Sequence, residues 1–508
     1  MAVSTNGKAS LPIAQGADRL LSGGSFASGG WAGTTLTYSF RANAPATMPD
    51  DTSGFSTFNA AQIRGAELAL QAWADVAAIT FQRIGGGDSG PGAYSDGGTI
   101  RFANYGAGKD GAAAFTYLPG PTGARAASSV QGDGWYNSAL SYNTAPALHN
   151  YGQKVLIHEI GHALGLDHPG DYDGAGADIT YARSAQFFED SRQYTVMSYF
   201  SESNTGGAFA GRYASTPLVL DIAAIQALYG PNMSAFLGDT TYGFNANADR
   251  PWLQAEGPGA RLIFCAWDAG GTDTFDFSGY SQAQSIDLNP TAFSDVGGMV
   301  GNVSIAAGAS IENAVGGWGA DRIAGNTAGN YIRGMNGDDS VFGDAGDDDL
   351  NGNQGADTVD GGEGGDTVRG GQGGDLVLGG GGDDPHVNGN LGNDTVRSGD
   401  GNDTVYGGQG ADHLFGGDGN DLLSGDIGDD ALAGGAGADW FRIAAGGGHD
   451  WVADFSLGLG DKIVLAPGTV YSLGGYQNQM VITLSGGESI GLAGVAPASL
   501  SGEWLIFA

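Results

Sequence analysis

The chain has 508 residues, too many for one compact core, so we expect two or more domains. Its 56 acidic residues outnumber 20 Lys and Arg, and the formal net charge of -36 argues against nucleic acids and anionic membranes as partners and favours cations. The single cysteine excludes an internal disulfide framework, and the apolar neighbours of Cys265 predict that its side chain is buried.

The first 24 residues are small and polar and show no strong hydrophobic period. We expect residues 1–24 to form a flexible leader or a short pro-segment that is partly disordered. They lack the continuous apolar stretch of a signal peptide, and no window of the chain reaches the ~18 apolar residues of a membrane span. We therefore expect a soluble chain without membrane insertion, for which any export must use another route.

Residues 25–235 have the mixed pattern of an α/β (α+β) domain. Alternating apolar residues predict strands in four segments, over residues 34–40, 79–84, 98–105 and 111–120. Helical spacing of apolar residues predicts one helix over residues 60–77 and a second over residues 221–230. These elements are sufficient to hold a functional site.

The segment HEIGHALGLDH carries three histidines within eleven residues. Positions i and i+4 lie on one face of a helix, so His158 and His162 can present their imidazoles to one ion. Gly165 breaks the helix, and His168 can return from the following turn as a third ligand. Three neutral histidines leave a fourth position open for water, which is typical of a catalytic zinc, and Glu159 lies beside the metal.

Single histidines on helices are usually ordinary core or surface residues. We assign the histidines outside this segment to that class, namely His149, His386, His413 and His449. The bare H-E-x-x-H pattern would arise by chance in roughly one in a hundred chains of this length. The extended H-E-x-x-H-x-x-G-x-x-H pattern is intact here, so we favour the metal site for the other three.

From about residue 316 a nine-residue period takes over and continues for about fourteen units, counting one ten-residue turn with Pro385. The units follow G-G-x-G-x-D-x-U-x, where U is apolar, the repeat of calcium-binding parallel β structures. One turn buries a single large apolar side chain such as Val341, so the turns must stack. We expect an all-β parallel β-roll (RTX) over residues 236–442 and a β cap that closes it over residues 443–508.

Glycines permit tight turns in this repeat, and an aspartate recurs at its sixth position. Oxygen ligands at this density suit Ca²⁺, and the acids repel one another without it, so metal binding and folding should be one event. The alternative is a disordered acidic linker, which the strict phase of the repeat disfavours. Asn330 and Pro385 weaken the ion sites in their turns. The expected calcium ligands are Asp321, Asp339, Asp348, Asp357, Asp366, Asp375, Asp394, Asp403, Asp412, Asp421 and Asp430.

The histidine segment followed by YTVMSYF (residues 194–200) resembles the metzincin arrangement of zinc helix and Met-turn. The Gly-Asp repeats behind it resemble the serralysin family of secreted bacterial metalloproteases. Segments such as GDGWYN, DIAAIQALYG and WDAGGTDTFDFSGYS follow in the order of that family, so the resemblance covers nearly the whole chain. The repeat is longer than the compact roll that we associate with the family. This leaves open the number of calcium ions and a second role for the roll.

The resemblance implies a metzincin protease domain over residues 25–235 and roles for individual residues. Met197 would form the hydrophobic floor beneath the histidines, and Tyr199 would reach the zinc and later stabilise the oxyanion. Extended substrate would pair with a strand made of Ala112, Ala113, Ala114, Phe115, Thr116 and Tyr117. A calcium site ahead of the roll would use Gly238, Thr240, Asp268, Gly270 and Asp273.

These observations predict a secreted, extracellular zinc endopeptidase of broad specificity that calcium stabilises. A zinc-bound water would be the nucleophile, with Glu159 as its general base. The family resemblance implies export by type I secretion machinery, which would read an uncleaved C-terminal signal such as GEWLIFA. We expect a monomer that acts on proteins or peptides, and an inhibitor protein remains open.

Two other functions make different predictions for the sequence. A calcium-dependent surface protein predicts a degraded zinc motif, and a lipase with a calcium roll needs a G-x-S-x-G elbow, which we do not find.

Overall fold

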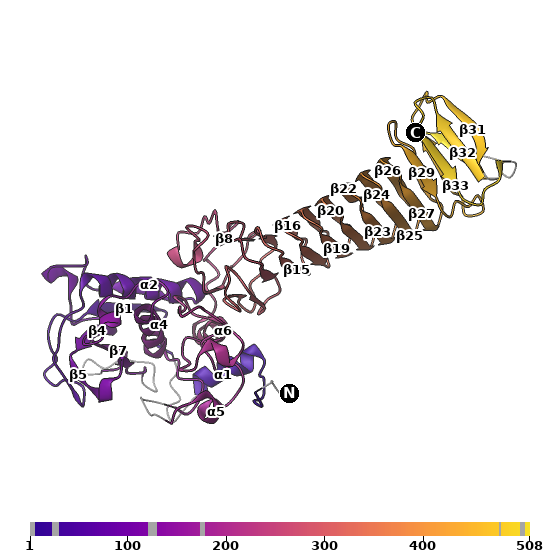
Figure 1. Cartoon of the computed structure of the whole chain (residues 1–508). Coiled ribbons are helices and arrows are strands. Elements are labelled where there is room, and N and C mark those ends of the chain that lie inside the picture. Colours follow the sequence, from indigo (N-terminus) through magenta and orange to yellow (C-terminus); the bar gives the residue numbers. More distant parts are fainter. Residues whose placement is uncertain (1–5, 23–29, 120–129, 173–177, 477–478, 498–502) are drawn as a thin grey trace.

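The computed structural model describes the chain except for residues 1–5, 23–29, 120–129, 173–177, 477–478 and 498–502. Figure 1 shows a mixed α/β unit at the N-terminal end, from which a long stack of β-strands extends to the C-terminus. This architecture confirms the predicted fold class. Among the described residues, no helix has both the length and the apolar character needed to cross a membrane.

A five-stranded sheet in the order β3-β1-β4-β7-β6 forms one part of the N-terminal unit. Its strands are β1 (Thr35–Phe40), β3 (Thr80–Arg83), β4 (Ile100–Tyr105), β6 (Ala114–Thr116) and β7 (Asp133–Asn137). The first four strands in this order are parallel, whereas β6 runs antiparallel to β7 at the edge of the sheet. The four predicted strands are present, but the one expected over residues 111–120 has only three residues in regular strand geometry.

Two helices cross beside this sheet, α2 (Ala60–Val76) and α4 (Tyr151–Leu164). α2 begins with a capping box in which Asn59 and Gln62 bond reciprocally to each other's backbone, which satisfies two otherwise unpaired amides. The Trp73 indole on α2 donates to the carbonyl of Ile157 on α4 over 3.1 Å. A third helix, α6 (Val219–Tyr229), ends at Gly230 as predicted.

Shorter elements connect these parts. They are β2 (Thr52–Ser53), β5 (Ala107–Gly108), α3 (Ser141–Thr144), α5 (Tyr181–Ser184), and the 3₁₀ turns Pro91–Ala93, Lys109–Gly111, Glu202–Asn204 and Pro251–Leu253.

The N-terminal segment differs from its prediction. Residues 13–22 form the helix α1 (Ile13–Ser22), whose Ala17 and Leu20 are buried. The Leu20 carbonyl accepts a 2.8 Å hydrogen bond from the backbone of Asp167, and α1 packs against α6. The expectation of a flexible leader is therefore wrong for residues 6–22, while residues 1–5 and 23–29 lie outside the described residues.

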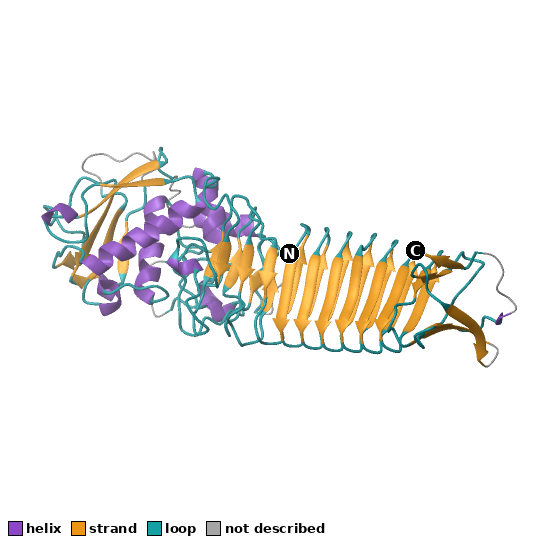
Figure 2. Ribbon diagram, turned by 90° about the horizontal axis from the view of Figure 1, so that it is seen from above, coloured by secondary structure: helices purple, strands orange, loops and turns teal. Residues whose placement is uncertain are grey.

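Among the described residues, two twelve-stranded sheets form the roll, and consecutive strands alternate between them from β14 to β30. Figure 2 shows the strands stacked along the length of the roll. One sheet holds β8 (Thr241–Gly243), β10 (Thr274–Asp276), β14 (Asn313–Val315), β16 (Tyr331–Asn336), β18 (Asp349–Gln354), β20 (Thr367–Gln372), β22 (His386–Leu391), β24 (Thr404–Gln409), β26 (Leu422–Ile427), β28 (Trp440–Arg442), β30 (Lys462–Leu465) and β34 (Leu505–Phe507).

The other sheet holds β11 (Ser285–Asp287), β15 (Arg322–Asn326), β17 (Ser340–Asp344), β19 (Thr358–Glu363), β21 (Leu376–Gly381), β23 (Thr395–Asp400), β25 (His413–Asp418), β27 (Ala431–Ala436), β29 (His449–Val452), β31 (Tyr471–Tyr476), β32 (Gln479–Leu484) and β33 (Ser489–Leu492). Beside the start of the roll lies a small sheet of β9 (Phe264–Ala266), β12 (Phe293–Ser294) and β13 (Val303–Ile305).

The apolar side chain of each repeat is buried in the roll, as the pattern predicts. Ile332 aligns with Leu350, and Leu350 with Val368, two turns further along the chain each time, and all three are fully buried. A single row of such side chains gives a narrow core, so the stacking of successive turns supplies the burial that one turn lacks.

In the described part of residues 443–508, where we predicted a β cap, the strands extend the two sheets of the roll. β29, β30, β33 and β34 continue its two sheets in parallel register, and β32 runs antiparallel to both β31 and β33. The sheets continue because the backbone N–H and C=O groups at the edge of each turn need hydrogen-bond partners, and these strands supply them. The described part of the tail that resembles a secretion signal is the outermost strand, β34, paired with β30.

Candidate metal centre and active site

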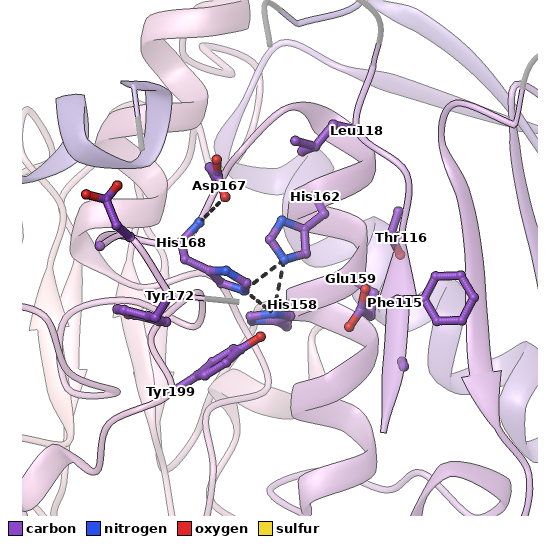
Figure 3. Close-up of a pocket in the computed structure, with 13 residues that line it drawn as sticks. Phe115, Thr116, Leu118, His158, Glu159, His162, Asp167, His168, Tyr172 and Tyr199 are labelled. Carbon is purple, nitrogen blue, oxygen red and sulfur yellow. Dashed lines mark hydrogen bonds between the residues drawn. The ribbon is translucent and has the colours of Figure 1, made fainter. Parts of the chain in front are cut away.

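Three histidine side chains meet beneath a cleft in the N-terminal unit (Figure 3). His158 and His162 lie one turn apart on α4, and Gly165 ends this helix with φ 110°. That left-handed conformation favours glycine, and it returns the chain so that His168 faces the helix. The Nε2 atoms lie 3.2 Å apart for His158–His162 and for His162–His168, and 3.3 Å apart for His158–His168.

The tautomers of these histidines suit a metal. The Nδ1 atom of His158 lies 2.9 Å from the carbonyl of Val196, and that of His162 lies 2.7 Å from the carbonyl of Leu166. A carbonyl can only accept, so Nδ1 carries the proton and Nε2 presents a lone pair. Lone pairs that converge in a buried site repel one another unless a cation lies between them. The residues therefore fit Zn²⁺.

Burial also keeps these histidines neutral, as metal ligands must be. It holds the pKa of His158 and of His168 well below the usual value, and the neighbouring cationic groups add to this effect. Among the described residues, these three form the group of His, Cys, Asp or Glu whose ligand atoms all lie within 4.8 Å of one another.

Glu159 extends from α4 toward the edge strand β6 (Figure 3). Its carboxylate is buried, with 5% of the residue exposed. It lines both cavities that meet at the histidines, one of about 460 Å³ and one of about 940 Å³. A carboxylate at this junction can contact the part of a bound molecule that spans both cavities.

A buried aspartate holds the turn below α4. Asp221 accepts hydrogen bonds from Thr195 Oγ1 at 2.5 Å, from the Val196 amide at 2.8 Å and from the Leu218 amide at 2.8 Å. The turn places Met197 under the helix, where a Cβ on Gly161 would come within 2.7 Å of its sulfur. Sequence reasoning identified Met197 but missed Asp221 in this role, because its position suggested only a helix start.

Aromatic side chains close the other side of the site. The Tyr199 ring centroid lies 4.6 Å from that of His168, and Figure 3 shows its hydroxyl directed toward the histidines. Tyr172 stacks on His168 with ring centroids 5.5 Å apart. Its hydroxyl donates to Asp190 over 2.7 Å, as does that of Ser198. Tyr172 and Asp190 were missed, although an aromatic residue four positions after His168 was a visible signal.

Among the described residues, β6 is an edge strand of the five-stranded sheet, and it lies along the cleft. Ala114, Phe115 and Thr116 line both cavities, while Ala112, Ala113 and Tyr117 line only the larger one. An edge strand with unpaired backbone groups can pair with an extended peptide. All six residues of the expected substrate strand thus border the cleft, although only three are in regular strand geometry.

Comparison with known protein families gives two matches. The family described as "Peptidase M10 serralysin C terminal" matches residues 231–472, and "Matrixin" matches residues 30–181. The chain is 46% identical over 339 residues to "Metallopeptidase AprA" of Pseudomonas marginalis, which covers 65% of this chain and 68% of that protein.

The chain belongs to the serralysin family.

Two further relatives show how much of each protein is matched. The chain is 53% identical over 291 residues to "Serralysin C" of Dickeya chrysanthemi, covering 56% of this chain and 58% of that relative. It is 47% identical over 340 residues to "Metalloprotease AprA" of Pseudomonas entomophila (strain L48), covering 64% and 66%. The matched stretch thus spans less than two thirds of either of these serralysin-family relatives.

The roll of this serralysin-family chain contains two ladders of buried acidic residues. In each ladder, an Oδ1 atom accepts the backbone amide of the ladder residue two turns earlier, at distances between 2.6 and 3.3 Å. One ladder joins Asp321, Asp339, Asp357, Asp375, Asp394, Asp412, Asp430 and Asp450. The other joins Asn330, Asp348, Asp366, Asp384, Asp403, Asp421, Asp439 and Asp461.

The ladders leave one oxygen of most aspartates without a partner. Among the described residues, the Oδ2 atoms of the ladder aspartates from Asp339 to Asp439 are buried and accept no hydrogen bond. Burial raises the pKa of Asp339 to about 8 and that of Asp348 to about 7, and neighbouring carboxylates add to the shift. Rows of buried oxygens that lack donors fit hard cations.

The ladders hold more residues than the repeat pattern identified. Asp384, in the ten-residue turn, accepts from the Asp366 amide at 2.8 Å, so the ladder is continuous despite the adjacent Pro385. Asp384 lies nine residues after Asp375 and keeps the phase of the repeat, and the extra residue of this turn follows it. The expectation of a weakened turn considered Pro385 and overlooked this carboxylate. Asp439 was also missed, although it holds the sixth position of the last nine-residue unit. Asp450 and Asp461 were missed because the repeat fades around them while the stack continues.

The residues expected to form a calcium site ahead of the roll lie together. Asp268 accepts from the Tyr242 hydroxyl and from the Gly270 amide, and Asp273 accepts from the Thr240 amide at 2.7 Å. The Thr240 hydroxyl lies 2.9 Å from the carbonyl of Gly238. Burial raises the pKa of Asp273 to about 7, with Asp268 as a further cause. Closely spaced carboxylate and carbonyl oxygens of this kind fit a hard cation.

Proposed function

We propose that this chain is a secreted, calcium-stabilised zinc endopeptidase that hydrolyses peptide bonds in extracellular proteins. The observation that carries the proposal is the convergence of three Nε2 lone pairs next to Glu159, at the point where two cavities meet along an edge strand. His158, His162 and His168 would hold the zinc. When bound, Zn²⁺ supplies a Lewis acid that polarises a carbonyl and lowers the pKa of water.

Glu159 acts as the general base in this proposal. Its buried carboxylate takes a proton from the attacking water and passes it to the departing amine, which is the role of a positioned carboxylate in acyl transfer. Tyr199 donates a hydrogen bond from its hydroxyl to the oxyanion that forms on the substrate carbonyl. Both groups border the same two cavities, so both can reach one scissile bond.

The substrate main chain pairs with β6. Backbone hydrogen bonds to an edge strand supply affinity that does not depend on side chains, so the proposal includes broad specificity. Proteins and peptides are the substrate class, and type I secretion machinery and an inhibitor protein are the proposed macromolecular partners.

The roll binds several calcium ions in this proposal, through the aspartate ladders and the site at Asp268 and Asp273. Buried carboxylates need either protons or cations, so the roll is unfolded where free calcium is scarce and folds at millimolar calcium outside the cell. The unfolded form is the one that can be exported.

Casein hydrolysis by the full chain in millimolar calcium, with and without ortho-phenanthroline, tests the function. The variant Glu159→Gln should retain zinc, measured by atomic absorption, and should lose turnover. Glu256→Gln makes the same chemical change at an exposed position and should retain both. Turnover that survives chelation, or a Glu159→Gln variant that remains active, would contradict the proposal.

A further inference from the structure

The two cavities beside the histidines differ in charge. The larger one, of about 940 Å³, is lined by the cationic residues Lys109, Lys154 and Arg192, with Asp51 and Asp110 also on its wall. The smaller one, of about 460 Å³, has Asp167 and Asp171 on its wall and neither Lys nor Arg among its lining residues. Apart from Glu159, which both share, a substrate therefore meets opposite charges on the two sides of the site.

Lys154 is a buried lysine, with 6% of the residue exposed, and burial together with the nearby Arg192 lowers the pKa of its side chain to about 7. Its Nζ lies 3.4 Å from Nδ1 of His158, but that nitrogen already donates its proton to Val196. The contact therefore joins two donors and does not satisfy the ammonium. Among the described residues, Lys154 has no carboxylate within ion-pair distance, which is rare for a buried lysine.

Arg192 lies against the same cavity and is also incompletely paired. Its nearest carboxylate contact is Glu202, at 3.8 Å from Nε, which is longer than a hydrogen bond. The Nε atom is buried and has no hydrogen-bond partner among the described residues. The guanidinium lies 5.2 Å from the centroid of the Tyr213 ring, so packing fixes its position. Lys154 and Arg192 together offer several hydrogen-bond donors to a substrate group that carries acceptor oxygens.

The direction of the edge strand indicates which substrate residue meets these donors. Ala112 and Ala113, at the start of the substrate strand, border only the larger cavity. At its other end Tyr117 still borders the larger cavity, and Leu118 borders only the smaller one. Antiparallel pairing is the more stable arrangement for an added strand. A substrate paired antiparallel with β6 therefore enters along Leu118 and leaves along Ala113, with the residue that follows the cut bond in the larger cavity.

We propose that Lys154 and Arg192 form a subsite for a carboxylate and that the enzyme favours glutamate directly after the scissile bond. This inference rests on the proposed peptidase function and adds a preference to its broad specificity. The carboxylate supplies acceptors to the ammonium of Lys154 and the Nε of Arg192. Glutamine has the same shape without the charge, so it separates recognition of the carboxylate from simple filling of the cavity.

The test uses internally quenched peptides that are acetylated and amidated, so that no terminal carboxylate competes. They differ only in the residue after the cut bond, which is Glu, Gln or Leu, and mass spectrometry confirms the cut position. We expect kcat/KM for the Glu peptide to exceed that for the Gln peptide by about tenfold or more, as for a charge-assisted hydrogen bond. A further Leu peptide ends in a free C-terminus two residues beyond the cut. It tests whether a terminal α-carboxylate can replace the side-chain carboxylate of glutamate in the subsite.

Lys154→Met and Arg192→Gln should each reduce the Glu-to-Gln ratio toward one while the Leu peptide is still cut. Arg212→Gln removes a nearby exposed charge outside the larger cavity and should leave the ratio unchanged. The ratio is a readout that a purely structural role would not move, and zinc content is measured for each variant. If Lys154→Met does not fold, the Glu-to-Gln ratio of kcat/KM for Arg192→Gln tests the subsite by itself.

A wild-type ratio near one, with the Leu peptide cut normally, would overturn this subsite and leave the peptidase proposal intact. A preference that occurs only for the free C-terminus would also overturn it, because the guest would then be an α-carboxylate. Failure to cut any peptide would refute the peptidase proposal and this inference with it.

Discussion

Replacing Asp221 with alanine should loosen the turn that supports the metal centre. The Asp221 side chain is fully buried and accepts from Thr195 Oγ1, the Val196 amide and the Leu218 amide. Each buried donor left without an acceptor costs about 1–3 kcal/mol. The three donors share one small cavity that water can partly fill, so we expect a total loss of about 3–5 kcal/mol in the free energy of unfolding.

The same change should weaken zinc binding, because the Val196 carbonyl orients His158 through Nδ1. Loss of such an outer partner typically lowers metal affinity by about 10–100-fold. Urea unfolding of the N-terminal unit, followed by far-ultraviolet circular dichroism in millimolar calcium, measures the first effect, and competition with a chromogenic chelator measures the second.

Asp178→Ala is the matched control, since the Asp178 side chain is 94% exposed and pairs with Arg183 at the surface. It should change the free energy of unfolding by less than about 0.5 kcal/mol. If Asp221→Ala matched this control in both stability and zinc affinity, the reasoning about the turn would be refuted.

The raised pKa values of Asp339 (about 8) and of Asp348 and Asp375 (about 7) mean that the calcium-free folded roll holds protons which the unfolded chain has released. Its stability is therefore greatest below the ordinary carboxyl pKa of about 4 and is lost as pH rises through about 7 to 8, so circular dichroism in chelator should show more β-structure at about pH 5 than at about pH 8. Calcium needs the ionised carboxylates and should reverse this trend; an apo roll that gains structure as pH rises would contradict the assignment. Gly161→Ala places a Cβ 2.7 Å from the Met197 sulfur and should cost about 1–3 kcal/mol, whereas Gly92→Ala, where a Cβ meets nothing within 4 Å, should be nearly neutral in the same urea titration. Leu350→Ala removes a fully buried side chain from the roll and should cost about 2–5 kcal/mol in calcium; Leu391→Ala, at a 41% exposed position, should leave the thermal midpoint of the roll almost unchanged.

The features that the sequence predicted well depend on local spacing. The convergence of His158, His162 and His168 follows from one helical turn and from a glycine that ends the helix, and both are visible within eleven residues. The parallel roll is also local, because each nine-residue unit carries its own turn, its own aspartate and its own buried side chain. A periodic sequence therefore predicts contacts between residues that are separated by a fixed number of positions in the chain.

Features that depend on distant partners were not visible in this way. The helix α1 has only ten residues, and although one of its faces is apolar, that face is covered by α6, about two hundred residues away. The ladder that contains Asp384 also continues past the extra residue to Asp403, because stacking follows the backbone of the neighbouring turn and not the count of residues.

By itself, then, the sequence determined the two-part architecture, the metal-binding motif and the acidic repeat, because each is written in residues that are neighbours along the chain. Only the tertiary structure decided that Asp221 holds the Met197 turn, that Tyr172 and Asp190 support His168, and that Lys154 and Arg192 share one cavity. Burial and the choice of partner are properties of three-dimensional neighbours, and a helix pattern that places Lys154 on an inner face does not reveal which charges it will meet there.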